Sequence, residues 1–133
     1  MRILIADDEY LVRASLISML DELNLPSYSL QEATTGEQLV DVVRHDLPDI
    51  AFVDIRMPGL NGLEVLSRVK ACRPEQCVVM LSMHASAKHI RGALNAGAMG
   101  YLTKETAPDE LVDAIRAVFS GQRYLGDDLE RLL

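Results

Sequence analysis

Short runs rich in apolar residues alternate along this chain with longer segments in which apolar residues recur every three or four positions. The short runs predict strands at residues 3–6, 28–32, 50–53, 78–81 and 98–102. The helical spacing covers residues 11–23, 39–43, 63–69, 90–96 and 111–119. Each helical segment is followed by a residue that disfavours helix; these are Asn24, Pro48, Pro74, Gly97 and Gly121.

This alternation of strands and helices is typical of a parallel sheet with helices on both faces. The strands are nearly continuous in apolar residues, as strands buried on both faces must be. Because crossover connections are right-handed, the natural strand order is 2-1-3-4-5. The predicted fold class is therefore α/β, a doubly wound five-stranded parallel sheet of flavodoxin-like order.

The last residues depart from the alternation. Residues 121–126 look like a turn, after which Asp127 and Glu130 are spaced to cap a short helix. Two interpretations stay open: a terminal turn folded onto the fifth helix, or the beginning of a linker. The predicted organisation is one domain over residues 1–120, followed by residues 121–133 as a C-terminal turn and the start of a linker to an effector domain absent from this chain.

Polar groups suited to phosphate chemistry follow four of the predicted strands. Asp7 and Asp8 follow the first, Asp54 the third, Ser82 the fourth and Lys104 the fifth. The carboxyl ends of parallel strands meet at one edge of the sheet, where ligands bind beside the topological switch point. Taken singly, the acidic pair could cap a helix, the serine could serve a turn and the lysine could be a solvated charge. Their joint occurrence at four strand ends favours one shared site.

The chemistry of such a site follows from its charges. Two carboxylates about 4 Å apart repel by on the order of 4 kcal/mol at an effective dielectric constant near 20, so a cation or a proton must stabilise the cluster. Mg²⁺ fits best, since it accepts carboxylate and phosphate oxygens. Lys104 adds a positive charge and Ser82 a hydroxyl donor. We therefore expect Asp54 to accept a phosphoryl group, with Asp7 and Asp8 as ligands of Mg²⁺.

Composition and charge narrow the range of partners. The net charge of −7 argues against nonspecific binding of nucleic acid by this segment. No apolar run approaches the roughly 20 residues that a membrane span needs, so we expect no membrane partner and a cytoplasmic location. Cys72 and Cys77 have no His or third Cys nearby, which favours reduced structural thiols over a zinc site.

These residues resemble the receiver domain of two-component response regulators over about residues 1–120. The motifs that carry the likeness are the acidic pair Asp7-Asp8, the phosphoacceptor Asp54 with the loop at 54–62, the switch hydroxyl Ser82, and Gly100-Tyr101-Leu102-Thr103-Lys104. Residues 96–105 and 121–125 look most like the NarL/FixJ branch. Members of that branch usually carry a C-terminal helix-turn-helix that binds DNA.

The resemblance implies a signalling cycle. A histidine kinase would donate its phosphoryl group to Asp54, and the aspartyl phosphate would later hydrolyse. The backbone carbonyl of Arg56 would complete the metal site. Ser82 would move toward the phosphoryl group, Tyr101 would become buried, and the surrounding surface would change. The resemblance further implies a regulatory domain rather than an enzyme, catalysing only its own phosphorylation and dephosphorylation. It also implies a homodimer on activation and transcription regulation through DNA that only the absent domain binds.

Three departures from the family pattern bear on this expectation. Glu105 stands where many receivers have proline after the lysine, so we expect a trans peptide bond at Lys104. Met83 replaces the usual small residue after the switch hydroxyl, and we hypothesise that it covers the acyl phosphate and slows attack by water. Arg56 and His84 stand at variable positions and could tune phosphate lifetime, although a solvent-facing role is the simpler interpretation of His84.

Three rival functions fit the sequence less well. A haloacid-dehalogenase-type phosphatase also uses a strand-end Asp and Mg²⁺, but that family has a second Asp two residues past the nucleophile as its acid/base, where this chain has Arg56. A receiver that is never phosphorylated would act only as an interaction module, yet every expected polar group is present. Nucleotide binding is disfavoured because neither GxGxxG nor a P-loop occurs.

Overall fold

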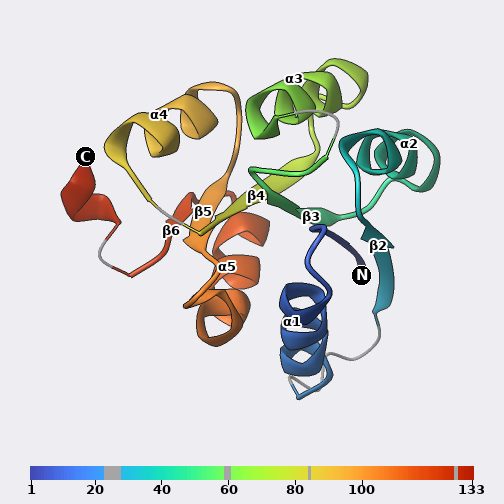
Figure 1. Cartoon of the computed structure of the whole chain (residues 1–133), viewed down its shortest axis with the longest axis horizontal. Helices are drawn as coiled ribbons and strands as arrows, with labels where there is room; N and C mark the ends of the chain where they lie inside the picture. Colours follow the sequence, from blue (N-terminus) through green and yellow to red (C-terminus); the bar gives the residue numbers. More distant parts are fainter. Residues whose placement is uncertain (23–27, 59–60, 84, 128) are drawn as a thin grey trace.

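The computed structural model describes residues 1–22, 28–58, 61–83, 85–127 and 129–133. Within them, one parallel sheet has the order β2-β1-β3-β4-β5-β6 (Figure 1). Its strands are β1 (Arg2–Ala6), β2 (Ser29–Ala33), β3 (Ile50–Asp54), β4 (Cys77–Ser82), β5 (Gly100–Thr103) and β6 (Tyr124–Leu125). The flavodoxin-like α/β fold is confirmed. The expectation of five strands is wrong, because Tyr124 and Leu125 add a sixth strand beyond β5.

Helices cover both faces of this sheet. They are α1 (Tyr10–Glu22), α2 (Gly36–Asp46), α3 (Gly62–Cys72), α4 (Ala87–Asn95) and α5 (Ala107–Phe119), with a short 3₁₀ helix η1 (Glu130–Leu132) near the C-terminus. Helices α1 and α5 lie on one face, and α2, α3 and α4 lie on the other (Figure 1). The predicted end of the first helix at Asn24 lies outside the described residues.

Local sequence signals set where several helices begin and end. Thr35, Asn61 and Ser86 are the N-cap residues of α2, α3 and α4, and each side chain accepts a hydrogen bond from a backbone N–H in the first turn. Pro108 lies in the first turn of α5, where its missing N–H is not needed. Gly97, just past α4, has φ = 106°, a left-handed conformation that favours glycine.

The core consists of two apolar layers separated by the sheet. Successive residues of one strand point to opposite layers: Leu4 packs toward α2, α3 and α4, whereas Ile3 and Ile5 pack toward α1 and α5. Every residue of β3 is buried. Strand β3 is thus packed on both faces, and Asp54 is its last residue.

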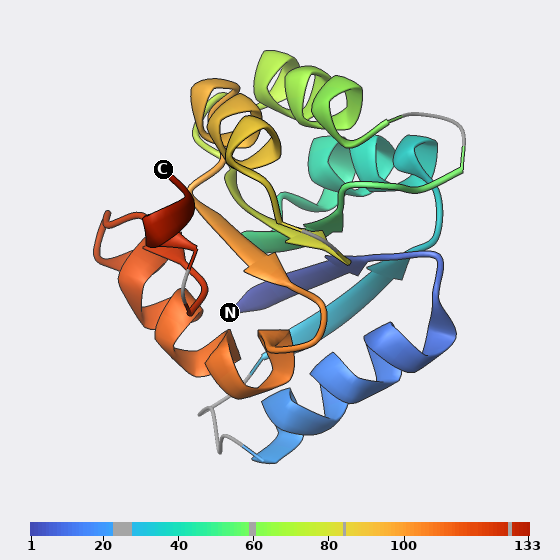
Figure 2. The ribbon, with the colours of Figure 1, turned by 60° about the vertical axis from the view of Figure 1, so that its left-hand side comes forward.

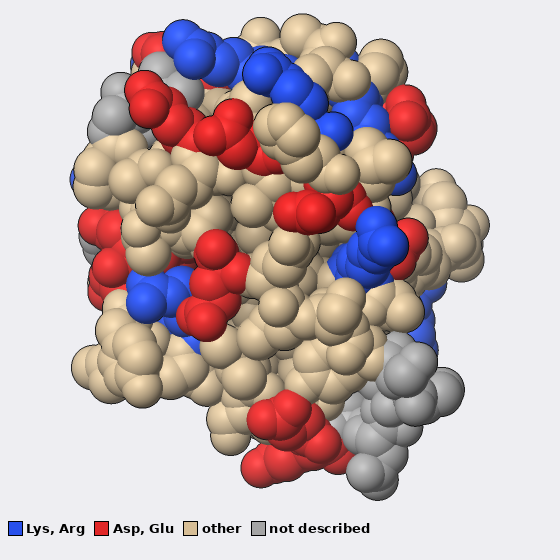
Figure 3. All heavy atoms as spheres, turned by 90° about the vertical axis from the view of Figure 1, so that its right-hand side faces the viewer, with Lys and Arg blue, Asp and Glu red and all other residues tan. Residues whose placement is uncertain are grey.

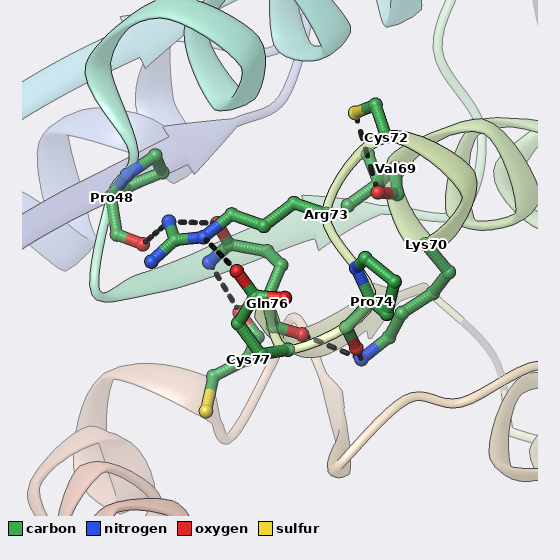
Figure 4. A network of polar contacts seen from close by, with 9 residues as sticks. Pro48, Val69, Lys70, Cys72, Arg73, Pro74, Gln76 and Cys77 are labelled. Atoms are coloured by element: carbon green, nitrogen blue, oxygen red, sulfur yellow. Dashed lines mark hydrogen bonds and ion pairs between the residues drawn. The ribbon is translucent and has the colours of Figure 1, made fainter.

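The opposite edge of the sheet is held by a polar network at the start of β4 (Figure 4). The Arg73 guanidinium donates to the Pro48 carbonyl (2.8 Å) and to Gln76 Oε1 (2.9 Å). Lys70 Nζ donates to the Gln76 carbonyl (2.6 Å), and burial lowers the Lys70 pKa. This network ties the end of α3 to β3 and β4. The nearby Cys72 and Cys77 are free thiols.

The C-terminal residues pack on the sheet edge. The Asp127 N–H donates to the Glu110 carboxylate at 2.9 Å, and η1 is preceded by Leu129 with no side-chain cap. The proposed capping role of Asp127 is therefore wrong, because its backbone is engaged by α5 instead. Leu129 is buried.

Among the described residues, no helix is both long enough and apolar enough to cross a bilayer.

Candidate functional site

The predicted site residues meet at the carboxyl edge of the sheet. Backbone hydrogen bonds continue one residue past the strands there: Asp7 N–H donates to the Ala33 carbonyl (3.0 Å), and Lys104 N–H donates to the Ser82 carbonyl (2.8 Å). The backbones of Asp7 and Lys104 are therefore fixed by their neighbours. Asp54 lies between these positions, since β3 pairs with both β1 and β4.

Lys104 is the centre of the charge arrangement. Its Nζ lies 3.0 Å from Asp7 Oδ2, 3.0 Å from Asp54 Oδ2 and 2.8 Å from Glu9 Oε1. Only 4% of its side chain is exposed, so the interpretation of Lys104 as a solvated surface charge is excluded. Burial would lower the pKa of this ammonium, but hydrogen bonds to the three carboxylates outweigh burial and hold the pKa above its ordinary value. Lys104 remains a cation at any physiological pH.

Asp54 is a buried carboxyl group whose two oxygens have different partners. Its Oδ1 accepts from the Arg56 N–H at 3.0 Å, and its Oδ2 faces Lys104. Burial raises the pKa of Asp54 to about 6, although the Arg56 N–H and Lys104 oppose the rise and the charge of Asp7 adds to it. Asp54 is consequently ionised at neutral pH, the form in which a carboxylate acts as a nucleophile.

The acidic side chains form a cluster of hard oxygen ligands. Asp7, Asp8, Glu9 and Asp54 each place one carboxylate oxygen within 4.8 Å of the others. Asp7 is fully buried and is oriented by the Glu9 N–H, which donates to its Oδ1 at 2.8 Å. Asp8 and Glu9 are exposed. Such an all-oxygen set suits Mg²⁺, which is bound by few carboxylates and keeps several waters.

A cavity of about 570 Å³ opens onto this cluster. Asp54, Ser82 and Lys104 line it, so a phosphoryl group can reach all three. Met83 also lines the cavity and is 62% exposed, which places it at the opening. The cavity wall further includes Arg56, Asn61, Leu63 and His89, most of which the sequence analysis did not assign to the site.

The two predicted switch residues are both buried. Ser82 is the last residue of β4, and Tyr101 in β5 has no exposed surface. Burial raises the pKa of the Tyr101 hydroxyl, and the Ser82 side chain opposes that rise. The third tuning candidate, His84, lies outside the described residues. No cis peptide bond occurs among the described residues, as expected with Glu105 after Lys104.

Glu9 was grouped with the other acids as suited to a hard cation, but its contact with Lys104 was not predicted. It belongs to the acidic run after β1, and its contact with Lys104 bridges residues 95 positions apart in the chain. The signal available in the sequence was a third acid beside the pair, which alone does not show that its side chain turns inward. Gly62 also has a role that the sequence analysis did not assign. A Cβ there would lie 2.6 Å from the backbone of Ile55, so only glycine lets the loop after β3 close against α3.

Charges elsewhere on the surface are mixed. On the face shown in Figure 3, basic side chains stand beside acidic ones instead of forming one broad patch.

An acidic pair after β1, a buried aspartate ending β3 and a lysine after β5 define a class of protein. Residues 3–116 match the family described as "Response regulator receiver domain", and the chain belongs to that family.

Individual relatives show which response regulators this chain is similar to. The chain is 36% identical to the response regulator UvrY of Escherichia coli K12 over 127 residues, covering 96% of this chain and 58% of UvrY. It is 33% identical to the response regulator GacA of Pseudomonas aeruginosa over 135 residues, covering 99% of this chain and 61% of GacA. The chain thus spans about three fifths of the length of these curated relatives.

Solved structures agree with the sequence relatives. A LuxR-family two-component response regulator from Aurantimonas is 30% identical, with a TM-score of 0.86 over 98% of this chain and 92% of that one. The receiver domain of the putative response regulator NarL from Mycobacterium tuberculosis is 30% identical, with a TM-score of 0.82 over 91% of this chain and 97% of that one. The likeness to the NarL/FixJ branch is confirmed.

Proposed function

We propose that this receiver domain accepts a phosphoryl group on Asp54 from the phosphohistidine of a histidine kinase, with Mg²⁺ as cofactor. The observation that carries the proposal is the contact between buried Asp54 and buried Lys104, which line a cavity together with Ser82. A structural ion pair would not need an open cavity or three further carboxylates beside it.

The residues divide the chemistry as follows. An oxygen of the ionised Asp54 attacks phosphorus while the bond from phosphorus to the histidine nitrogen breaks, so the imidazole leaves with the electron pair. Asp7, Asp8, Asp54 and the Arg56 carbonyl would hold Mg²⁺, which neutralises charge on the phosphoryl oxygens. Lys104 lies near enough to move from the Asp54 carboxylate to a phosphoryl oxygen.

The signal is carried by the switch residues. Once Asp54 carries the phosphoryl group as an acyl phosphate, Lys104 would lose one carboxylate partner, and the new phosphoryl oxygens would attract the Ser82 hydroxyl. Ser82 lies in β4 and Tyr101 lies in β5, and these two strands are paired. A shift of β4 toward the phosphoryl group would therefore also move β5. We infer a two-state surface formed by α4, β5 and α5, biased by the charge at Asp54.

We place the output of this switch, the regulation of transcription, in a further domain of the protein. Because the chain spans only about three fifths of UvrY and GacA, we infer that a DNA-binding domain follows residue 133 and that the whole protein regulates transcription in the cytoplasm. We further propose that phosphorylation promotes a homodimer. Residues 1–120 would form the receiver and residues 121–133 the start of the linker.

Intact mass spectrometry tests the proposal. Brief treatment with a small acyl phosphate and Mg²⁺ should add one phosphoryl group to the wild type and none to Asp54→Asn. The matched control is Asp41→Asn, which removes an exposed carboxylate on α2 and should still gain the group. Absence of any gain in the wild type would favour an interaction module. Continued turnover of a chromogenic phosphate ester would favour a phosphatase instead.

A further inference from the structure

The sixth strand places the end of the chain directly against the switch strand. Strand β6 pairs with β5 in parallel, with Tyr124 opposite Gly100 and Leu125 opposite Tyr101. The Gly126 N–H donates to the Tyr101 carbonyl at 2.9 Å. We call residues 124–127 and 129 the strap. In Figure 2 the red C-terminal residues lie next to β5, close to both α4 and α5.

A buried carboxylate on α5 holds the strap in place. Glu110 is only 5% exposed, and its Oε2 accepts from the Tyr124 hydroxyl (2.9 Å) and from the Asp127 N–H (2.9 Å). Burial raises the pKa of the Tyr124 hydroxyl, and the Glu110 carboxylate adds to that rise. The hydroxyl therefore stays protonated and remains a donor. A buried acid whose described partners both come from the strap has no evident role in the phosphoryl site.

Two glycines leave room for the strap. A Cβ on Gly100 would lie 2.9 Å from the Tyr124 carbonyl oxygen, closer than side-chain atoms approach such a backbone. A Cβ on Gly126 would lie 3.3 Å from the Glu110 carboxylate oxygens. The close approach of the strap thus depends on residues of β5 and of the strap itself, which indicates a built contact rather than a loose tail.

The strap also shares its apolar packing with the switch aromatic. Leu129 is 5% exposed and belongs to the same apolar cluster as Tyr101, together with Ile90 and Ala93 of α4. Leu125 packs against this cluster. The strap therefore contacts the backbone of Tyr101 through a hydrogen bond and lies in the same packed layer as its ring. Movement of the Tyr101 ring out of the core would remove part of the packing that buries Leu129.

We propose that docking of the strap on β5 and phosphorylation of Asp54 stabilise each other, so that the strap carries the switch from Tyr101 to the chain beyond residue 133. The proposal rests on the function proposed above. We infer that the coupling is positive because Tyr101 is fully buried in the structure while the strap is docked. Buried Tyr101 is the state that phosphorylation is proposed to favour. Because coupling is reciprocal, the factor by which binding of the phosphoryl group stabilises the docked strap equals the factor by which docking stabilises that binding, so a change that undocks the strap weakens the binding by that factor.

Hydrogen exchange and ligand affinity test the two directions of this coupling. Fluoroberyllate with Mg²⁺, a mimic of the phosphoryl group, should slow exchange of the Gly126 and Asp127 amides in the whole chain. Tyr124→Phe, which removes one hydrogen bond to Glu110, should weaken the apparent fluoroberyllate affinity about 5-fold, the lower end of usual coupling. Leu129→Ala removes apolar packing instead and should act in the same direction.

Tyr28→Phe is the matched control. It also deletes a phenol that donates to a carboxylate, that of Asp21, but at the β2 side of the sheet. It should leave fluoroberyllate affinity unchanged. A merely structural role for Tyr124 would lower stability equally with and without fluoroberyllate, whereas coupling makes the loss larger when fluoroberyllate is bound.

The outcomes separate this proposal from the proposed function. If the wild type gains a phosphoryl group yet strap exchange is unchanged, or is faster, the coupling is overturned and the phosphoacceptor role stands. If Tyr124→Phe and Leu129→Ala both bind fluoroberyllate as the wild type does, the coupling is likewise overturned. If the wild type neither gains a phosphoryl group nor binds fluoroberyllate, both proposals fall together.

Discussion

Replacing Asp54 by Asn should stabilise the protein in the absence of divalent metal, and should do so more strongly as pH rises. The Asp54 carboxyl is 2% exposed, and its pKa is raised from 3.8 to about 6. Burial of the charge therefore costs free energy whenever the group is ionised in the folded state. Asn keeps an oxygen that can accept from the Arg56 N–H, now at 3.0 Å from Asp54 Oδ1, and it carries no charge.

The pH window follows from the direction of the shift. Below pH 3.8 the carboxyl is protonated in both the folded and unfolded states, so it contributes no pH-dependent penalty. Between 3.8 and about 6 only the unfolded state releases the proton, and stability falls as pH rises. The penalty is about 1.6 kcal/mol at pH 5 and levels off at about 3 kcal/mol by pH 8. The gain from Asp54→Asn should therefore grow by about 1.4 kcal/mol between those two pH values.

Urea unfolding in EDTA at pH 5, 6, 7 and 8 measures this difference. Asp41→Asn removes an exposed carboxylate on α2 and should give a nearly constant difference from the wild type across the same range. Added Mg²⁺ should narrow the gap at pH 8, since it stabilises the wild type by about 1.4 kcal/mol at ten times its dissociation constant. A gap between Asp54→Asn and wild type that is flat with pH would refute the reasoning, because it would mean that Asp54 is not desolvated.

Three further predictions concern single side chains around the same edge. Lys104→Met leaves Asp7 and Asp54 buried without their counter-charge, and should slow phosphoryl gain about 100-fold by intact mass, whereas an unchanged rate would exclude Lys104 from the chemistry. Gly62→Ala places a Cβ 2.6 Å from the Ile55 backbone and should cost about 2 kcal/mol in urea unfolding, so an unaltered midpoint would contradict the tight loop. Met83→Ala opens the cavity mouth and should speed loss of the phosphoryl group severalfold in a mass time course; unchanged hydrolysis would show that Met83 does not shield it.

The parts of the fold that could be predicted are those with local or periodic signals. Strand β3 was recognisable from an unbroken apolar run, because burial on both faces leaves no room for polar alternation. The strand order was predicted from right-handed crossovers together with the common flavodoxin-like arrangement, neither of which depends on a particular residue. The convergence of Asp7, Asp54 and Lys104 then followed from topology, since parallel strands present their carboxyl ends at one edge.

The parts that could not be predicted depend on contacts between distant residues. Strand β6 has only two residues, and its pairing is stabilised by Glu110 from α5 and by the absence of a side chain at Gly100. Nothing in the sequence around Glu110 or Gly100 indicates that either residue contacts residues 124–127. Asp127 was misinterpreted for the same reason: its spacing from Glu130 suits a cap, yet a buried carboxylate elsewhere offers its N–H a stronger partner.

The charge balance of the site links these observations to function. Four carboxylates, from Asp7, Asp8, Glu9 and Asp54, form one cluster. One ammonium, that of Lys104, contacts three of them, those of Asp7, Glu9 and Asp54. Such a cluster is a poor way to stabilise a fold, because each unpaired carboxylate adds repulsion that Lys104 cannot cancel. A phosphoryl group on Asp54 adds more negative charge to the same space, so it can be held only if a divalent cation is bound and Lys104 turns toward it. The proposed phosphorylation would therefore rearrange the polar contacts of β3, β4 and β5 together, and the strap pairs directly with β5.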